Sequence, residues 1–390
     1  MASLASELTE KQDVSLAIAT IYDGKGLFRH EEDGIQYYLL PQKKPKYKYD
    51  SSLEKYWAEI VDQYLPDVIH IHGTEFAHGL ACINACPGRR FVISIQGLVS
   101  VYLKYFYAGI RLSEYIKHIT LNEVRTKNTV FQEKRILKER ADIELKYIRG
   151  CNNIIGRTFW DYSHVKAINS NVRYHFCNEV LRPIFYEGPR WSIENRQTHT
   201  IFMSQAYSQR QGLHKMFQAL QIVKKEYPEV HLRVAGIDAT GGTKWVQRIN
   251  SYGAFLRSLI KRLNLKKNIT FLGPLKAELM AQEFRNAHVF VCASTIENSP
   301  NSLGEAQLLG TPCIASFVGG VPDMVKDGET GLLYRFDDYV VLAYKIIQLF
   351  ANDDLAKHIS QNEVNAALER HNKTTITSKM QEIYKTITEV

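Results

Sequence analysis

The chain has 390 residues, 45% of them hydrophobic, with a formal net charge of +8 and a pI near 9.0. This length predicts two ordinary domains, each with its own core. No run of about eighteen uninterrupted apolar residues occurs, and the N-terminus lacks the apolar stretch of a signal peptide. These features argue against a membrane-spanning helix or a secreted protein and predict a cytoplasmic location. The basic charge favours an anionic partner: a phosphorylated substrate, an acidic membrane surface or nucleic acid.

The six cysteines are scattered along the chain and lie partly in apolar runs. We therefore expect reduced, buried thiols rather than a disulfide framework. Cys82 and Cys86 are four residues apart on a helical pattern, but no paired histidines lie near them in the sequence. Their spacing does not predict a zinc site.

In the first half of the chain, short apolar runs alternate with helical patterns. This alternation is typical of an α/β domain with a parallel sheet. The sequence predicts a helix at 2–12 and another at 53–64, and strands at 14–19, 34–40, 67–73, 90–96 and 151–155.

Three polar residues follow these predicted strands and are candidates for binding a second substrate. Glu75 and His78 come just after the strand 67–73, and we expect both to line a cleft. A metal site that adds His72 to this pair is disfavoured, because the helical two-histidine spacing of zinc enzymes is absent. Arg157 stands at the end of the strand 151–155, where a cation can contact a phosphate or an acceptor.

Residues 101–149 form long helical patterns with two open interpretations. Tyrosines and phenylalanine are followed by alternating charges with an excess of lysine and arginine, among them Lys134, Arg135, Lys138 and Arg140. One interpretation is a solvated helical face with salt bridges. The other is an interfacial surface that meets anionic lipids, because basic and aromatic side chains together suit a headgroup layer.

A stretch without regular period, 182–197, carries Pro183, Gly188 and Pro189 and predicts a domain boundary. Strands and helices alternate again after it. The predicted strands are 199–204, 231–235, 268–272, 289–292 and 312–317, and the predicted helices are 213–224, 243–264, 278–286, 303–309, 339–351, 354–369 and 373–388.

The most informative part of the chain is the strand, polar loop and helix from 289 to 310. Gly310 sits where a helix C-cap belongs, and Pro312 prevents continuation. The first helical amides, at Asn301, Ser302 and Leu303, lack partners inside the helix and suit a phosphate or diphosphate. Glu297 and Glu305 flank these amides, and carboxylates accept hydrogen bonds from paired hydroxyls. This arrangement predicts a ligand with sugar rings on either side of a diphosphate.

The wider stretch resembles the donor-binding signature of the retaining family 4 glycosyltransferases. Glu297 and Glu305, separated by seven residues, precede Gly310-Thr311-Pro312, Gly319-Gly320 and the segment Asp327-Gly328-Glu329-Thr330-Gly331-Leu332-Leu333. The match covers about forty positions. It implies the GT-B fold: two Rossmann-like, doubly wound domains that face a central cleft.

The resemblance also implies residue roles. Glu297 contacts the transferred sugar, Glu305 contacts the ribose, and the amides of 301–303 hold the diphosphate. Gln96 stands where many relatives have a histidine that touches the donor sugar. Gln205 stands where an arginine is expected, so Arg210 becomes the expected diphosphate clamp.

The predicted site therefore has three groups of residues. The catalytic group is Glu297, Gln96 and Arg210. The donor-binding group is Glu305, Asn301, Ser302, Leu303, Gly212, Lys215 and Gly273, and the acceptor-binding group is Glu75, His78 and Arg157. No protein-bound metal and no cofactor is expected; the nucleotide-diphosphate sugar is the donor substrate.

The resemblance implies an acceptor-binding domain over 1–185, a nucleotide-sugar domain over 186–370, and a final helix, 371–390, that returns to the first domain. Relatives begin with a strand and a glycine-rich loop ahead of the first helix. No such segment precedes Ala2 in this sequence, so we expect either a truncated form or a start that was assigned late.

The function predicted is glycosyl transfer with retention of configuration, from a nucleotide-diphosphate sugar to a saccharide or lipid-linked acceptor. The setting is polysaccharide or glycoconjugate synthesis, with contact to the inner face of an anionic membrane. The alternative is a catalytically weak relative that only binds nucleotide-sugar or saccharide, a reading favoured by Gln96, Gln205 and the missing loop. A phosphorylase is disfavoured because no lysine-anchored pyridoxal site is suggested, and a nucleic-acid binder because no recognised module occurs.

Overall fold

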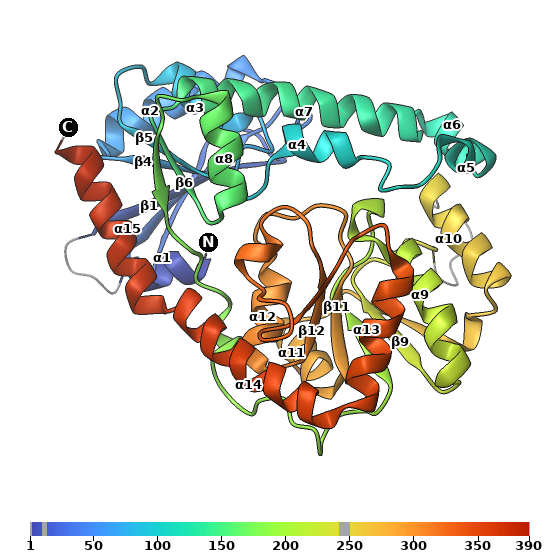
Figure 1. Cartoon of the computed structure of the whole chain (residues 1–390). Helices are drawn as coiled ribbons and strands as arrows, with labels where there is room; N and C mark the ends of the chain where they lie inside the picture. Colours follow the sequence, from blue (N-terminus) through green and yellow to red (C-terminus); the bar gives the residue numbers. More distant parts are fainter. Residues whose placement is uncertain (1, 10–13, 242–249, 390) are drawn as a thin grey trace. The chain divides into compact units, whose positions relative to one another are not determined.

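The computed structural model describes residues 2–9, 14–241 and 250–389, and it divides into two compact units (Figure 1). Unit 1 comprises 1–104, 135–180 and 371–390, and unit 2 comprises 105–134 and 181–370. Within the described ranges, none of the helices is both long enough and apolar enough to cross a bilayer.

Unit 1 holds two separate sheets. The first has the order β1-β3-β2, in which β1 and β3 are parallel and β2 is antiparallel to β3. The second has the order β4-β5-β6-β7, and all its neighbours are parallel. The strands are β1 Leu16–Tyr22, β2 Phe28–Glu32, β3 Ile35–Pro41, β4 Ile69–His72, β5 Phe91–Ser94, β6 Asn153–Gly156 and β7 Arg173–Phe176.

Helices cover both faces of the strands of unit 1 (Figure 1). One apolar cluster joins α1 and α15 to the sheet, through residues such as Leu8, Val92 and Ile383. Another joins α2 and α3 to β1 and β3, through residues such as Leu40 and Trp57. The helices are α1 Ala2–Thr9, α2 Glu54–Tyr64, α3 His78–Ala85, α4 Val99–Tyr102, α7 Val130–Gly150, α8 Phe159–Ile168 and α15 Lys373–Thr388.

Unit 2 is built on one six-stranded parallel sheet with the order β10-β9-β8-β11-β12-β13. The strands β8, β11 and β12 are buried at every residue, which explains their continuous apolar sequences. The strands are β8 Thr200–Met203, β9 His231–Ala235, β10 Ile269–Gly273, β11 Val289–Cys292, β12 Cys313–Ser316 and β13 Leu332–Tyr334.

One core cluster of unit 2 lies between β11, β12, α11 and α12. Several helices belong to the described part of this unit. They are α5 Leu112–Lys117, α6 Leu121–Thr126, α9 Leu213–Glu226, α10 Ser251–Arg262, α11 Ala277–Asn286, α12 Asn301–Leu309, α13 Tyr339–Ala351 and α14 Asp353–Arg370. The 3₁₀ segments among the described residues are Ser51–Leu53, Leu103–Tyr105, Pro183–Phe185, Gln209–Gln211, Lys266–Asn268 and Val321–Asp323.

Most predicted elements lie within a few residues of the observed ones, and three strands were missed. β2 is exposed at every residue, β7 alternates polar and aromatic residues, and β13 has three residues, so none has a clear apolar pattern. The predicted helix 243–264 is observed from Ser251, and 243–249 lie outside the described residues.

The division into units differs from the predicted domains at two places. The first boundary lies at 180/181 rather than 185/186. The segment 105–134, predicted in the first domain, belongs to unit 2, because it packs on α9 and α10. The carbonyl of Ala108 accepts a hydrogen bond from His214 Nε2 at 2.9 Å, and the ring of His118 packs edge-on against Phe255.

Candidate functional site

The sheet order of unit 2 places a topological switch point between β8 and β11. The chain proceeds from β8 to β9 on one side, and β11 and β12 extend the sheet on the other side. The loops that follow β8 and β11 therefore diverge at the carboxyl edge of the sheet, where open α/β sheets bind ligands.

These two loops are held together by backbone contacts. The carbonyl of Arg210 accepts hydrogen bonds from the amide and the hydroxyl of Thr295, at 2.7 and 2.9 Å. A Cβ atom on Gly212 would lie 1.8 Å from the carbonyl oxygen of Ala293, and Gly212 has φ +74°. Only glycine fits this approach, so Gly212 fixes the distance between the two loops.

Glu297 lies in the β11–α12 loop with its carboxylate facing Ser294 and Arg210. The Ser294 hydroxyl donates to Glu297 Oε1 at 2.8 Å. Burial raises the pKa of Glu297, while the Ser294 hydrogen bond and the charge of Arg210 oppose that shift. The backbone is fixed as well, because Gly320 N donates to the Glu297 carbonyl at 3.1 Å. The structure thus brings together two of the three residues predicted as catalytic.

The helix α12 begins directly after this loop. Its N-cap is Pro300, which provides no side-chain cap. The amide of Leu303 was predicted to be free for the diphosphate, but it donates to the Pro300 carbonyl at 3.0 Å in a tightened first turn. The side chain of Leu303 is fully buried in the core. The amides of Asn301 and Ser302 remain as the donors of this helix end. The predicted C-cap, Gly310, adopts φ +75°.

Glu305 is 4% exposed and forms a bidentate ion pair with Arg182. Arg182 Nε and Nη2 donate to its two carboxylate oxygens, each at 2.7 Å, and the guanidinium lies over the ring of Phe185 at 4.6 Å. Burial raises the pKa of Glu305, and Arg182 opposes the shift. Each carboxylate oxygen has a second lone pair, so Glu305 can still accept hydrogen bonds from hydroxyl groups.

Two further residues predicted to bind the donor lie apart from this cluster. The Lys215 ammonium approaches the Asp337 carbonyl at 3.4 Å and the rings of Phe336 and Tyr339, and burial lowers its pKa. Gly273 ends β10 with φ +74°, and open space lies where its Cβ would be.

In unit 1, three predicted residues gather at the carboxyl edge of the sheet β4–β7. Arg157 Nη2 donates to Gln96 Oε1 at 2.7 Å and to the Ile95 carbonyl at 3.2 Å. A Cβ on Gly73 would lie 2.2 Å from Glu75 Oε2 and 3.5 Å from Gln96 Cγ, so Glu75 approaches the same place. Burial raises the pKa of Glu75, and nearby Arg140 and Arg157 oppose this effect.

His78, predicted beside Glu75, points elsewhere. Its ring stacks on Phe76 and lines an apolar cavity bordered by β1 and β4, and its Nδ1 is buried with no hydrogen-bond partner in the described part of the chain. Burial lowers its pKa to about 4. No three His, Cys, Asp or Glu side chains of the described residues are grouped as metal ligands would be.

Sequence reasoning missed two charged residues next to these sites. Glu179 accepts a hydrogen bond from Arg157 Nη1 at 2.6 Å and neutralises it, and Arg182 pairs with Glu305. Both stand in irregular segments without hydrophobic period. Their partners are 22 and 123 residues away, so no local pattern could have shown the pairing.

Residues 190–365 match a family model described as glycosyl transferases group 1. The D-inositol 3-phosphate glycosyltransferase of Arthrobacter sp. (strain FB24) is 26% identical over 243 residues, which cover 58% of this chain and 55% of that protein. The N-acetyl-alpha-D-glucosaminyl L-malate synthase of Bacillus anthracis is 29% identical over 126 residues, 32% of each protein. The chain spans about half, or less, of the length of these curated relatives.

Solved structures share the fold at lower identity. Sucrose-phosphate synthase from Thermosynechococcus elongatus matches with a TM-score of 0.72 at 17% identity, over 99% of this chain and 90% of that chain. Anabaena HepE in complex with UDP-glucose matches with a TM-score of 0.60 at 17% identity, over 85% and 82%. These neighbours are GT-B glycosyltransferases, so the fold predicted from the sequence is confirmed.

Proposed function

We propose that this chain, whose residues 190–365 match the family model of the glycosyl transferases group 1, moves a glycosyl group from a nucleotide-diphosphate sugar to a saccharide or lipid-linked acceptor. The curated relatives carry glycosyltransferase and synthase names, and HepE has been solved with UDP-glucose. The donor is a substrate here, and the proposed chemistry uses no further cofactor.

The observation that carries the proposal is the arrangement around α12. At the switch point of the sheet, the free first amides of a helix stand between two carboxylates, Glu297 and Glu305. An anionic diphosphate suits the amides and the helix dipole, and hydroxyl groups suit the carboxylates. Arg182 holds the Glu305 side chain in one orientation. Binding of a ribose therefore does not have to immobilise this side chain, which lowers the entropic cost of binding.

We propose transfer with retention of configuration. The acceptor oxygen forms a bond to the anomeric carbon while the bond from that carbon to the diphosphate oxygen breaks on the same face. The acceptor proton passes to the departing diphosphate oxygen. Glu297 orients the sugar, and Arg210 with the amides of α12 stabilises the charge that grows on the leaving group.

For the acceptor we propose the polar group in unit 1. Glu75 accepts hydrogen bonds from hydroxyls, and the Gln96 amide both donates and accepts. Arg157 shares its guanidinium between Gln96 and Glu179, so it orients Gln96 and is the weaker candidate for direct contact with an anionic acceptor.

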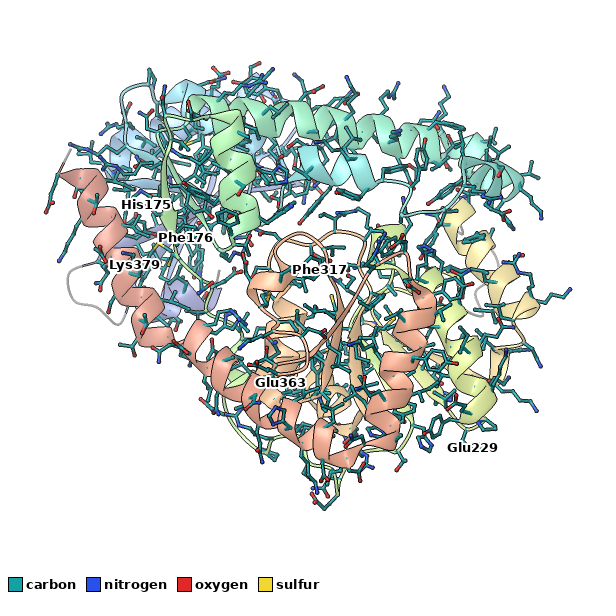
Figure 2. The ribbon with its side chains drawn as sticks, viewed as in Figure 1. His175, Phe176, Glu229, Phe317, Glu363 and Lys379 are labelled. Carbon is teal, nitrogen blue, oxygen red and sulfur yellow. The ribbon has the colours of Figure 1, made fainter. Side chains whose placement is uncertain are left out.

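The donor is tested first by thermal unfolding with a panel of nucleotide-diphosphate sugars, since a ligand that binds only the folded state raises Tm. The best donor is then titrated by calorimetry into wild type and Glu305→Gln. Losing hydrogen bonds to a charged group costs about 1.5–3 kcal/mol, so Kd should rise by about 10- to 100-fold. The matched control is Glu229→Gln, an exposed carboxylate just before β9 at the opposite edge of the sheet (Figure 2).

Equal donor affinity for wild type and Glu305→Gln would remove the ribose assignment. The stereochemical part is tested separately, by proton NMR of the first-formed product. An inverted anomeric configuration would contradict the retaining mechanism and leave donor binding intact.

A binding-only protein is the second candidate, favoured by two glutamines. Gln96 cannot carry a proton, and Gln205, at the position where an arginine is expected, is exposed. Release of free nucleotide diphosphate in the presence of donor and candidate acceptors distinguishes the two functions. Stoichiometric donor binding without any release would select the second.

We also propose that the α5–α6 arm, residues 105–134, contacts anionic lipid. Its apolar side chains are unusually exposed: Leu121 by 90%, Val124 by 59% and Ile116 by 54%. Exposed Lys117 and Arg125 stand among them. Apolar groups flanked by cations suit the headgroup layer of an acidic membrane. In contrast, the outer face of α7 carries i,i+4 ion pairs such as Arg135–Glu139 and fits the solvated interpretation.

Co-sedimentation with vesicles tests this contact. Wild type should bind vesicles that contain phosphatidylglycerol and not pure phosphatidylcholine. Leu121→Ser with Val124→Ser should weaken binding by about tenfold or more, given about 1.5–3 kcal/mol for each buried side chain. Leu279→Ser on α11, 51% exposed, is the control. Equal binding of both variants, or self-association in light scattering that disappears in the double variant, would contradict the proposal.

A further inference from the structure

The strand β2 forms an exposed outer edge of a sheet in unit 1. It is the last strand in the order β1-β3-β2, and every residue of Phe28–Glu32 is exposed. Its pairing with β3 runs from Phe28↔Leu39 to Glu32↔Ile35 without a bulge. In the described part of the chain, no further strand pairs with it. Such an edge presents unpaired backbone groups to any strand that approaches it.

The turn between β2 and β3 fixes which of these groups point outward. Asp33 and Gly34 have positive φ angles, +51° and +74°, as in a two-residue type I′ turn. The residues that flank such a turn, Glu32 and Ile35, lie directly opposite each other and form its hydrogen-bonded pair. The hydrogen-bonding pattern of the whole hairpin follows from this first pair.

Hydrogen-bonded and non-hydrogen-bonded pairs alternate along an antiparallel ladder. Phe28, His30 and Glu32 therefore direct their backbone groups toward β3. The N–H and C=O groups of Arg29 and Glu31 point the other way, to the outer edge. The two residues with outward backbone groups are thus a cation and an anion, two positions apart.

This edge is complementary to itself. When two β2 strands run antiparallel about a two-fold axis at His30, Arg29 of each copy lies opposite Glu31 of the other. Because both residues direct their backbone groups outward, each of these pairs can exchange two backbone hydrogen bonds. Opposite charges that face each other across two strands also stabilise the pairing.

The same charges disfavour the neighbouring arrangements. A two-fold axis at Arg29 or at Glu31 sets two like charges opposite each other, which is destabilising. An axis between two residues places an outward-directed residue opposite an inward-directed one, and the backbone bonds are lost. The sequence FRHEE of β2 also lacks the proline and lysine that protect many edge strands. Its charges therefore favour one register with a second copy.

The side chains at the edge are available for these contacts. Arg29 Nη2 donates to Glu59 Oε1 on α2 at 2.5 Å, and the two side chains are 46% and 45% exposed. A guanidinium has five N–H donors, so Arg29 can bind a second carboxylate as well. Glu31 is exposed and forms no ion pair with the described residues of its own chain.

We propose that β2 is the contact of a homodimer. The β2 strands of two copies pair antiparallel about a two-fold axis at His30, with Arg29 of each copy opposite Glu31 of the other, and the two three-stranded sheets become one continuous sheet. A contact made by one short strand is small, so the dimer belongs to the weak, transient class. The inference does not depend on the proposed transfer reaction.

Sedimentation equilibrium of the intact chain tests the dimer, from about 1 µM to about 300 µM because small interfaces bind weakly. Wild type should dimerise within this range. Arg29→Glu and Glu31→Arg each set like charges opposite each other in both pairs. Each variant should therefore raise the dissociation constant by about tenfold or more.

Mixing these two variants gives the most specific result. One strand then carries two anions and the other two cations, so both cross-strand pairs are attractive again. The equimolar mixture should form a heterodimer, detected by energy transfer between two fluorescent labels, although neither variant dimerises well alone. The double variant Arg29→Glu with Glu31→Arg exchanges the charges within each pair and should dimerise like wild type.

Two control variants separate the edge from other effects of charge. Glu59→Gln removes the partner of Arg29 within its own chain and leaves the edge charges unchanged. Arg135→Glu reverses an exposed charge on α7, away from this sheet. Both should dimerise like wild type. Thermal unfolding of every variant shows whether it is folded, and these exposed substitutions should leave Tm nearly unchanged.

Amide hydrogen exchange provides a second measurement. The amides of Arg29 and Glu31 should exchange more slowly in concentrated than in dilute wild type, whereas those of His30 and Glu32, which already bond to β3, should not change. The proposal is overturned if wild type stays monomeric over the whole range. It is also overturned if dimers form equally well in Arg29→Glu and Glu31→Arg, or if the dimer leaves the two edge amides unprotected.

Discussion

Both units are α/β folds, but the strands of unit 2 form one sheet and those of unit 1 form two. In unit 2, six parallel strands form one sheet, and its site is set by backbone geometry: Gly212 and Gly319 approach carbonyl oxygens, and α12 presents its amides. In unit 1, two sheets flank a cavity, and the polar group at the strand ends depends on the side chains of Arg157, Gln96 and Glu179. A backbone-built site leaves a recognisable sequence signature of glycines and prolines, whereas a side-chain network does not.

The strongest test of the backbone-built site is Gly319→Ala. A Cβ there would lie 1.8 Å from the Glu297 carbonyl oxygen, and Gly319 has φ +54°. We expect a loss of about 3–5 kcal/mol in the free energy of unfolding, among the largest effects of single substitutions. Gly328→Ala is the matched control: it has φ +78° but open space around its Cβ, so only the backbone cost of about 1–2 kcal/mol should appear.

Urea denaturation measures both variants. Equal losses of stability for Gly319→Ala and Gly328→Ala would show that the close approach of Gly319 to the Glu297 carbonyl does not fix the conformation of the loop. The site of unit 2 would then depend on backbone geometry no more than the site of unit 1 does.

For unit 1, the corresponding test is Glu144→Ala on α7. This buried carboxylate accepts from Val99 N at 2.7 Å, Ser100 N at 2.8 Å and the Thr74 hydroxyl at 3.0 Å, and so ties two loops to the helix. Removing it leaves buried donors unsatisfied at about 1–3 kcal/mol each, and we expect a loss of about 3 kcal/mol overall.

Glu139→Ala, an exposed member of an i,i+4 pair on the same helix, should change stability by no more than about 0.5 kcal/mol in the same denaturation experiment. If Glu144→Ala is equally mild, the side-chain network of unit 1 carries less of its stability than its geometry indicates.

The remaining test, with the smallest effect within one pH unit, concerns a buried carboxylate of unit 2 that has fewer hydrogen-bond donors around it than Glu144. Glu363 on α14 (Figure 2) is fully buried and lies beside Cys313, whose thiol and backbone partly oppose the effect of burial on its carboxyl group. Burial raises its pKa well above the usual carboxyl range. Because the pKa of Glu363 is higher in the folded than in the unfolded state, its protonated carboxyl group contributes fully to the free energy of unfolding below the unfolded pKa. This contribution is lost as the pH rises toward the folded pKa.

Wild-type stability should therefore fall on raising the pH through this window, by at most about 1.4 kcal/mol per pH unit for one proton. Glu363→Gln should flatten this part of the profile and make the protein more stable than wild type at pH 8. Thermal unfolding from pH 5 to pH 8 measures the difference. A parallel profile in the variant would show that Glu363 is not the group responsible.

The sequence predicted unit 2 well because its strands are fully buried and its helix ends carry strong local signals. The strand Val289–Cys292, the helix α12 and its C-cap Gly310 follow from an apolar run, a polar loop and a glycine before Pro312. The close pairing of Glu297 with Ser294 lies within that loop and is also local.

Contacts between distant segments could not be predicted in this way. Nothing near Arg182 signals that Glu305 is its partner, and the alternating charges of α7 conceal Glu144, the one carboxylate of that helix that binds two loops. The cavity in unit 1 was equally hidden, because it depends on two strand edges that come from residues 14–20 and 67–72.

The last helix has a consequence for how this protein is made. Ile376, Met380, Ile383 and Ile387 of α15 complete the core that contains Val92 and Ile155. Unit 1 is therefore assembled from chain stretches on both sides of segment 181–370, and its helix α15 is synthesised only after unit 2 has reached Arg370. During synthesis, the segment 181–370 can fold while the earlier residues still wait for their final helix, so nascent unit 1 is the part that needs protection from aggregation.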